Sequence, residues 1–216
     1  MPTITSVLPF PKRPGRFAVT VDGKLTAIIS LEAAERLKLA TGRLFDDALA
    51  VALEREAAQL KTYDRALDML ALRARSASDL RRTLVRKGEP PEYVDVAVER
   101  LLNAGFLDDA SFARQFARSR VLGAGLSRRR IATELARRGI ARDLAAAAID
   151  DVFGEEHVDE EATLERVARK KLGTLARLDA FTQRRRLYAF LARRGYDADD
   201  IGRVVNDLVR SASAGG

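Results

Sequence analysis

Three glycines set the register of an internal repeat that fills most of this 216-residue chain: Gly88, Gly139 and Gly195. When they are aligned, every copy has an aliphatic residue four and eight positions before the glycine and six, ten and thirteen positions after it. These fifteen residues are Leu80, Leu84, Val94, Val98, Leu101, Ile131, Leu135, Ala145, Ile149, Val152, Leu187, Leu191, Ile201, Val205 and Leu208. Such spacings place side chains on one helix face, so each glycine is expected to join two helices with a common core.

A glycine in the left-handed conformation ends one helix and turns the chain into the next. Each unit also has an upstream helical segment, at about residues 63–74, 109–122 and 157–172. The chain is thus predicted to be mainly α, with a tandem array of three three-helix modules at residues 62–105, 106–154 and 155–210. Neighbouring copies of a repeat of this length are expected to share core. The third copy carries extra residues around Leu172–Phe181.

The segment before the repeats has a different pattern. Arg16–Val21 and Lys24–Ile29 alternate apolar and polar residues around an Asp-Gly pair, which predicts a β-hairpin. Ser30 is expected to cap a helix, and a second helix is expected at residues 46–58. Residues 15–60 are therefore predicted to form a small hairpin and helix unit that precedes the array.

Both ends of the chain are predicted to lack packed structure. Residues 1–14 contain four prolines and are expected to be a disordered, extended tail. Residues 211–216 are small and polar and are expected to fray.

Charge is segregated within each repeat. The net charge is +7 and the isoelectric point is about 10.0, which favours polyanions or acidic protein surfaces as partners, although such a charge also suits a merely soluble protein. The helix before each glycine is basic and the helix after it is acidic. The candidate partner or DNA contacts are Arg81, Arg82, Arg86, Arg128, Arg129, Arg130, Arg137, Arg138, Arg184, Arg185, Arg186 and Arg193.

Two interpretations of these arginines stay open. A guanidinium fork holds phosphate or carboxylate with two hydrogen bonds, which favours partner binding. Cations in a last helical turn also complement the helix dipole, by roughly 0.3–1 kcal/mol. The dipole disfavours cations at helix starts, so the triplets Arg128–Arg130 and Arg184–Arg186 are the better partner candidates. Alanine substitution of Arg128–Arg130 is expected to weaken partner binding more than folding.

Enzymatic chemistry is not indicated. The chain has no cysteine, and its one histidine, His157, stands among acidic residues and is expected at an exposed helix start. Paired aspartates fall at helix ends of different units, and phosphate-loop, dinucleotide, nucleophile-elbow and zinc-protease motifs are absent. No cofactor and no metal are therefore expected. Without a long apolar run or a secretory signal, the expected location is the cytoplasm.

A set of short motifs spans the first two repeats: Ala66–Leu70, Arg75, Ser76, Asp79, Leu80, Leu84, Lys87, Gly88, Gly105–Asp109, Phe112, Ala113, Phe116, Arg120, Gly125, Arg130, Ile131, Glu134, Leu135, Gly139 and Ile140. Together these motifs resemble the RecX family, the regulators of the RecA recombinase. The match covers residues 62–153, and the third repeat follows by the register of its glycine. The hairpin is similar to an N-terminal extension that some members carry.

The resemblance implies a non-enzymatic protein of DNA repair, the SOS response and homologous recombination. It would bind, as a monomer, in the groove of the RecA filament on single-stranded DNA, and would mostly reduce ATP hydrolysis and strand exchange. The alternative is a helical DNA-binding or architectural protein that acts through phosphate contacts without RecA. Sequence-specific reading of DNA is disfavoured, because the helix after Gly139 is acidic and rich in alanine.

Overall fold

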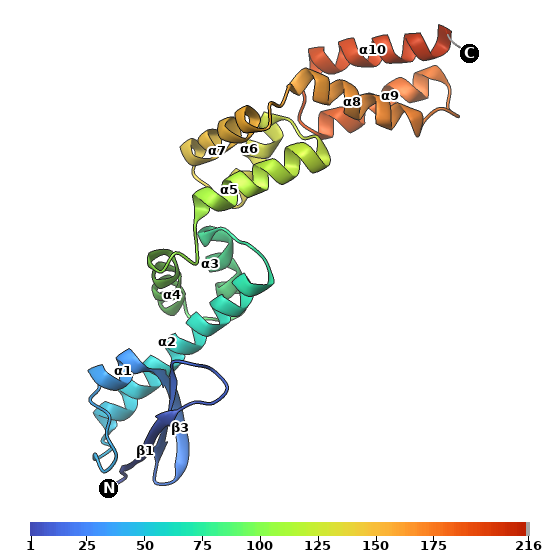
Figure 1. The fold of residues 1–216 in the computed structure, drawn as a ribbon. Coiled ribbons are helices and arrows are strands. Elements are labelled where there is room, and N and C mark those ends of the chain that lie inside the picture. The colour runs from blue at the N-terminus through green and yellow to red at the C-terminus, as the bar shows by residue number, and fades with distance from the viewer. Residues whose placement is uncertain (215–216) are drawn as a thin grey trace. The chain divides into compact units, whose positions relative to one another are not determined.

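The computed structural model describes residues 1–214, with side chains up to residue 211 (Figure 1). The chain is mainly helical, with a small N-terminal sheet and three sets of three helices, as predicted. It divides into two compact units, Met1–Leu107 and Asp108–Gly216, which are described separately below.

Three antiparallel strands open the first unit, in the order β1 (Ile4–Pro9), β2 (Arg16–Val21) and β3 (Lys24–Ser30). The predicted hairpin is β2–β3, in which Phe17 lies opposite Ile29. The prediction that residues 1–14 form a disordered tail is wrong, because β1 pairs with β2.

The physical reason for the missed strand lies in the position of its single proline. Strand β1 is at the edge of the sheet, and Pro9 is its last residue. An edge strand tolerates proline, since one side of its backbone needs no partner strand. Ile4 is fully buried with Val19 and Ile29 in the core of this unit, so β1 contributes to that core.

Two helices follow, α1 (Leu31–Arg36) and α2 (Asp47–Leu72). The Ser30 hydroxyl accepts a hydrogen bond from the backbone N–H of Ala33, so the predicted cap is present. The predicted break between residues 58 and 63 is absent. Helix α2 is continuous because the sequence has no glycine or proline between its ends. Its first part packs on the sheet and its last part belongs to the first repeat.

The first repeat is completed by α3 (Ala77–Arg86) and α4 (Pro91–Asn103). The second consists of α5 (Asp109–Arg118) with the π-helix η1 (Ser119–Gly123), α6 (Arg128–Arg137) and α7 (Arg142–Glu155). The third consists of α8 (Glu160–Gly173), α9 (Ala180–Arg193) and α10 (Ala198–Ala214). All fifteen aliphatic positions of the aligned repeats are buried, which confirms the pattern from which the helix pairs were predicted.

Three local predictions need correction. The repeats were expected to share core, but the buried side chains of α5–α7 and those of α8–α10 form separate clusters. Instead of starting a helix, His157 lies in the turn that ends α7, with a φ of 49°. Helix α10 continues to Ala214, so the frayed end predicted from residue 211 begins too early, and residues 215 and 216 lie outside the described part.

Candidate functional site

The arginines of the first repeat are partly neutralised by their own module. The Arg81 Nε lies 3.2 Å from a carboxylate oxygen of Asp95 on the acidic helix α4. Arg82 pairs at 3.6 Å with Asp79 on its own helix. Arg86 is exposed in the last turn of α3, and its side chain has no ion pair or hydrogen bond among the described residues. Only Arg86 of these three therefore presents an uncompensated charge.

The triplet at the start of α6 has a structural role that its sequence does not reveal. Arg128 forms an ion pair with Asp150, and its guanidinium carbon lies 4.1 Å from the ring centroid of Phe153. The backbone N–H of Arg128 donates to the Glu160 carboxylate at 3.1 Å. A carboxylate of α8 thus sits at the N-terminus of α6, where it offsets the helix dipole as well as the cation.

The two other members of the triplet are also engaged. The Arg129 guanidinium donates to the carbonyl oxygens of Gly195 and Tyr196, each at 3.1 Å. Arg130 pairs with Glu134 at 3.2 Å. Folding therefore gives this triplet a reason to be basic that the helix dipole alone does not, because Arg129 joins the second repeat to the turn of the third.

The basic pair that ends α6 differs between its two members. Arg138 donates to the carbonyl of Glu134 at 3.0 Å, and its guanidinium carbon lies 4.3 Å from the ring centroid of Phe116. Arg137 is exposed in the last helical turn. Arg138 is thus held against its own repeat.

The arginines of α9 have a different environment. All four candidates are exposed, and among the described residues none of their side chains has an ion pair or a hydrogen bond: Arg184, Arg185, Arg186 and Arg193. Between residues 166 and 196 the chain has ten arginines and lysines but only one carboxylate, Asp179. The third repeat therefore carries the least compensated charge of the candidate set.

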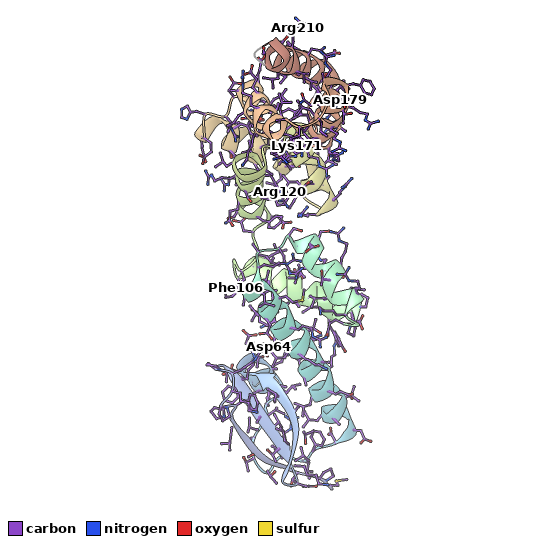
Figure 2. All side chains as sticks on the ribbon, turned by 90° about the vertical axis from the view of Figure 1, so that its right-hand side faces the viewer. Asp64, Phe106, Arg120, Lys171, Asp179 and Arg210 are labelled. Carbon is purple, nitrogen blue, oxygen red and sulfur yellow. The ribbon has the colours of Figure 1, made fainter. Side chains whose placement is uncertain are left out.

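The single carboxylate of that segment is itself engaged. Asp179 caps α9 by accepting a hydrogen bond from the backbone N–H of Thr182 at 2.9 Å. This backbone hydrogen bond, helped by the Thr182 hydroxyl, lowers the pKa of Asp179. Figure 2 labels Asp179, together with Lys171 at the end of α8. A carboxylate at the helix cap does not neutralise side chains further along the helix. The positive charges of the α9 arginines therefore remain uncompensated by Asp179.

The predicted contact set leaves out four further cations of the third repeat. Arg166, Lys170 and Lys171 on α8 lie with Arg194 around one recess. The three residues of α8 fall outside the helix that precedes Gly195, so the repeat pattern did not select them, whereas Arg194 belongs to the basic stretch directly before that glycine. The ratio of ten cations to one carboxylate between residues 166 and 196 was the available signal.

Within residues 1–214, no cluster of three or more histidine, cysteine, aspartate or glutamate side chains has the geometry to hold a metal ion. In the same part of the chain, no helix combines the length and the apolar character that crossing a membrane requires.

Each of the three repeats matches a model of a known protein family. Family models described as the first, second and third three-helix domains of RecX match residues 63–101, 108–149 and 159–205. These spans fall within the three modules expected from the sequence. The start of the first span also falls inside α2, where no helix ends.

Curated proteins named regulatory protein RecX are similar to this chain over most of their own length. The regulatory protein RecX of Amycolatopsis mediterranei is 36% identical over 154 residues, which cover 71% of this chain and 86% of the relative. That of Halorhodospira halophila is 36% identical over 148 residues, covering 68% and 88%.

Two solved structures share the fold. A crystal structure of regulatory protein RecX superposes with a TM-score of 0.73 at 21% identity and covers 96% of this chain and 100% of that one. RecX from Lactobacillus salivarius gives 0.53 at 17% identity, covering 70% and 96%. Because the family models span all three repeats and the curated relatives match over most of their own length, this chain belongs to the RecX family of regulatory proteins.

Proposed function

We propose that this protein regulates the RecA recombinase by binding its filament on single-stranded DNA. The observation that carries the proposal is the match of all three repeats to the three RecX domains. Its expected action is to reduce ATP hydrolysis and strand exchange, without chemistry of its own. That it acts as a monomer and in the cytoplasm stays part of the proposal.

The binding mode is proposed from the distribution of free charge. Exposed arginines without ion pairs occur in two separate modules, Arg86 in the first and Arg184–Arg186 with Arg193 in the third. A filament presents the same surface many times, so several weak contacts on one chain add through effective concentration. Arginine suits both DNA phosphates and acidic side chains of the recombinase. We therefore assign the main filament contacts to α9.

The test measures ATP hydrolysis by RecA on single-stranded DNA with increasing amounts of the purified protein. The variant Arg184→Ala/Arg185→Ala/Arg186→Ala should require roughly tenfold more protein for half-maximal inhibition, as expected when several charge-assisted contacts are lost. A matched control removes three exposed arginines outside the basic helices, namely Arg55→Ala/Arg73→Ala/Arg142→Ala, and should inhibit like the unmodified protein. No effect of the unmodified protein at micromolar excess would refute the proposal.

A second candidate function is binding to nucleic acid through phosphates without RecA. The density of cations between residues 166 and 196 favours it. It predicts tight DNA binding by the protein alone and a steep dependence on salt. A pull-down of RecA with and without DNA separates the two, because only the first proposal predicts retention of RecA.

A further inference from the structure

A small recess in the second unit combines four cations with no carboxylate. Its volume is about 220 Å³, and it lies among the turn after η1, helix α8 and the end of α9. The charged residues that line it are Arg166, Lys170, Lys171 and Arg194. Like charges gathered in one recess repel each other, so their common position is stabilised when an anion lies between them.

Arg194 is held in a fixed orientation at one side of the recess. Its Nε donates to the Ala124 carbonyl at 3.0 Å, and its guanidinium carbon lies 3.8 Å from the ring centroid of Phe190. Burial, with a smaller contribution from the charge of Arg193, lowers the pKa of Arg194. Among the described residues, neither of its terminal nitrogens donates a hydrogen bond. An oriented fork with free donors is the geometry that a tetrahedral oxyanion requires.

The other cations complete the lining. Lys171 also contacts Phe190, with its Nζ 5.4 Å from the ring centroid. Arg166 and Lys170 are exposed on α8, and within the described part of the chain their side chains have no ion pair. No aspartate or glutamate lines the recess, so no acidic group of the recess competes for these cations.

The backbone wall of the recess is built by close packing. The π-helix η1 ends at Gly123, and π-helical turns occur frequently at functional sites. Gly125 follows with a φ of 58°, and a Cβ there would lie 2.5 Å from the Val167 side chain. The Tyr196 hydroxyl donates to the Gly125 carbonyl at 3.0 Å. The turn is therefore fixed against α8, and the recess keeps its shape without a ligand.

We propose that this recess binds a phosphate group of single-stranded DNA. Two exposed arginines continue from it along α9, because Arg186 and Arg193 lie four residues before and three residues after Phe190, on the same helix face. A chain with regularly spaced phosphates matches this arrangement better than one isolated ion. A single strand also bends enough to place a phosphate in a recess while its neighbours meet the flanking arginines.

This inference deepens the proposed function by naming one ligand group and one site. It is tested on the full chain without RecA, by titrating a fluorescent oligothymidylate at several salt concentrations. The variant Arg166→Gln/Lys170→Gln should weaken binding about tenfold, and the slope of log K against log salt should fall by about 0.7 for one lost phosphate contact. The control Arg55→Gln/Arg142→Gln removes the same charge elsewhere and should keep both the affinity and the slope.

Each outcome of this experiment decides the inference. Equal weakening by both pairs would overturn it, because the effect would then be one of net charge. Competition by hexaglutamate as strong as by inorganic phosphate would overturn it in favour of a carboxylate ligand. Both exchanged residues are exposed, so the midpoint of thermal unfolding should not change. DNA binding with the predicted slope, but no effect on RecA, would refute the proposed function and leave the phosphate site in place.

Discussion

Gly88 and Gly195 occupy the same place in the first and third repeats, and their backbones have the same shape. Their φ angles are 88° and 87°, and each follows a basic helix. Their surroundings differ. A Cβ on Gly88 would meet nothing within 4 Å, whereas a Cβ on Gly195 would lie 2.5 Å from the Cβ of Arg130 and 2.6 Å from the Ser127 hydroxyl. The turn is common to both repeats, but the close contact is present in the third repeat and absent from the first.

The residue after each glycine shows the same divergence. It is buried in all three repeats, as Glu89, Ile140 and Tyr196. Glu89 accepts hydrogen bonds from Thr62, at 2.6 Å, and from Arg65 of α2. Tyr196 instead donates to a carbonyl of the second repeat. The residue at this position thus connects the first repeat to α2 through Glu89, whereas it connects the third repeat to the second through Tyr196.

Alanine substitution of the two glycines should give the largest difference in unfolding free energy between the first and third repeats. Gly88→Ala forces an L residue into the left-handed region and should cost about 1–2 kcal/mol of unfolding free energy. Gly195→Ala adds a clash with Arg130 and Ser127 and should cost at least about 3 kcal/mol. Urea unfolding followed by circular dichroism measures both. Equal losses would show that the contact around Gly195 relaxes without cost.

The two arginine triplets give the next largest difference. Replacing Arg128–Arg130 with alanine removes the hydrogen bonds to the Gly195 and Tyr196 carbonyls and should cost about 2 kcal/mol of unfolding free energy. Replacing Arg184–Arg186 should change it by less than about 0.5 kcal/mol, since those side chains are exposed and without ion pairs. The same urea titration compares the two variants. Similar stabilities would contradict the structural role of the first triplet.

Alkaline pH should reveal the smallest difference, through Tyr196. Burial, assisted by the negative charge of Glu160, raises the pKa of Tyr196 to about 12 from its usual 10.0. The unfolded chain therefore loses this proton before the folded chain does. The stabilisation is complete below about pH 10 and is lost as the pH rises toward about 12.

The corresponding measurement follows the unfolding free energy from about pH 9 to about pH 11. Tyr196→Phe should flatten the decline relative to the unmodified protein, because the titrating group is gone. Tyr188→Phe, at an exposed position of α9, serves as the control and should leave the decline unchanged. An unchanged decline in Tyr196→Phe would mean that other groups cause it.

The spacing of apolar residues was sufficient to predict the helix pairs, but it could not predict the contacts that connect one repeat to the next. Leu84, Leu135 and Leu191 were identified as core because helix spacing alone decides which face they share. The partners of Arg129 lie 66 and 67 residues further along the chain, and no local pattern encodes such a contact. Strand β1 was missed for a related reason, since the prolines in and around it are unfavourable locally, whereas its single proline, Pro9, is acceptable at the end of an edge strand.

The sequence was sufficient to predict that the candidate site consists of arginines on basic helices, but not which of those arginines form it. Basic helices were visible in the sequence, and the structure then divided their arginines into those paired with carboxylates and those left exposed. Carboxylates contribute to this division. Some lie on the same helix, as Glu134 does for Arg130, but others come from another helix, as Asp95 does for Arg81 and Asp150 for Arg128. The excess of cations between residues 166 and 196 is visible in the sequence, but only the fold shows that those of α8 lie beside Arg194.

The unbroken helix α2 makes the sheet and the first repeat a single cooperative element (Figure 1). A truncated chain that starts at residue 62, where the repeat begins in the sequence, would cut through the middle of this helix. Such a chain would lack the strands together with the buried Leu49 and Leu53, and the repeat would lose the helical turns that lead into Ala66. Amide hydrogens on the two sides of Leu60 should consequently exchange with solvent at similar rates, as parts of one opening event. The smallest fragment that folds from this end therefore includes the strands as well as the three helices.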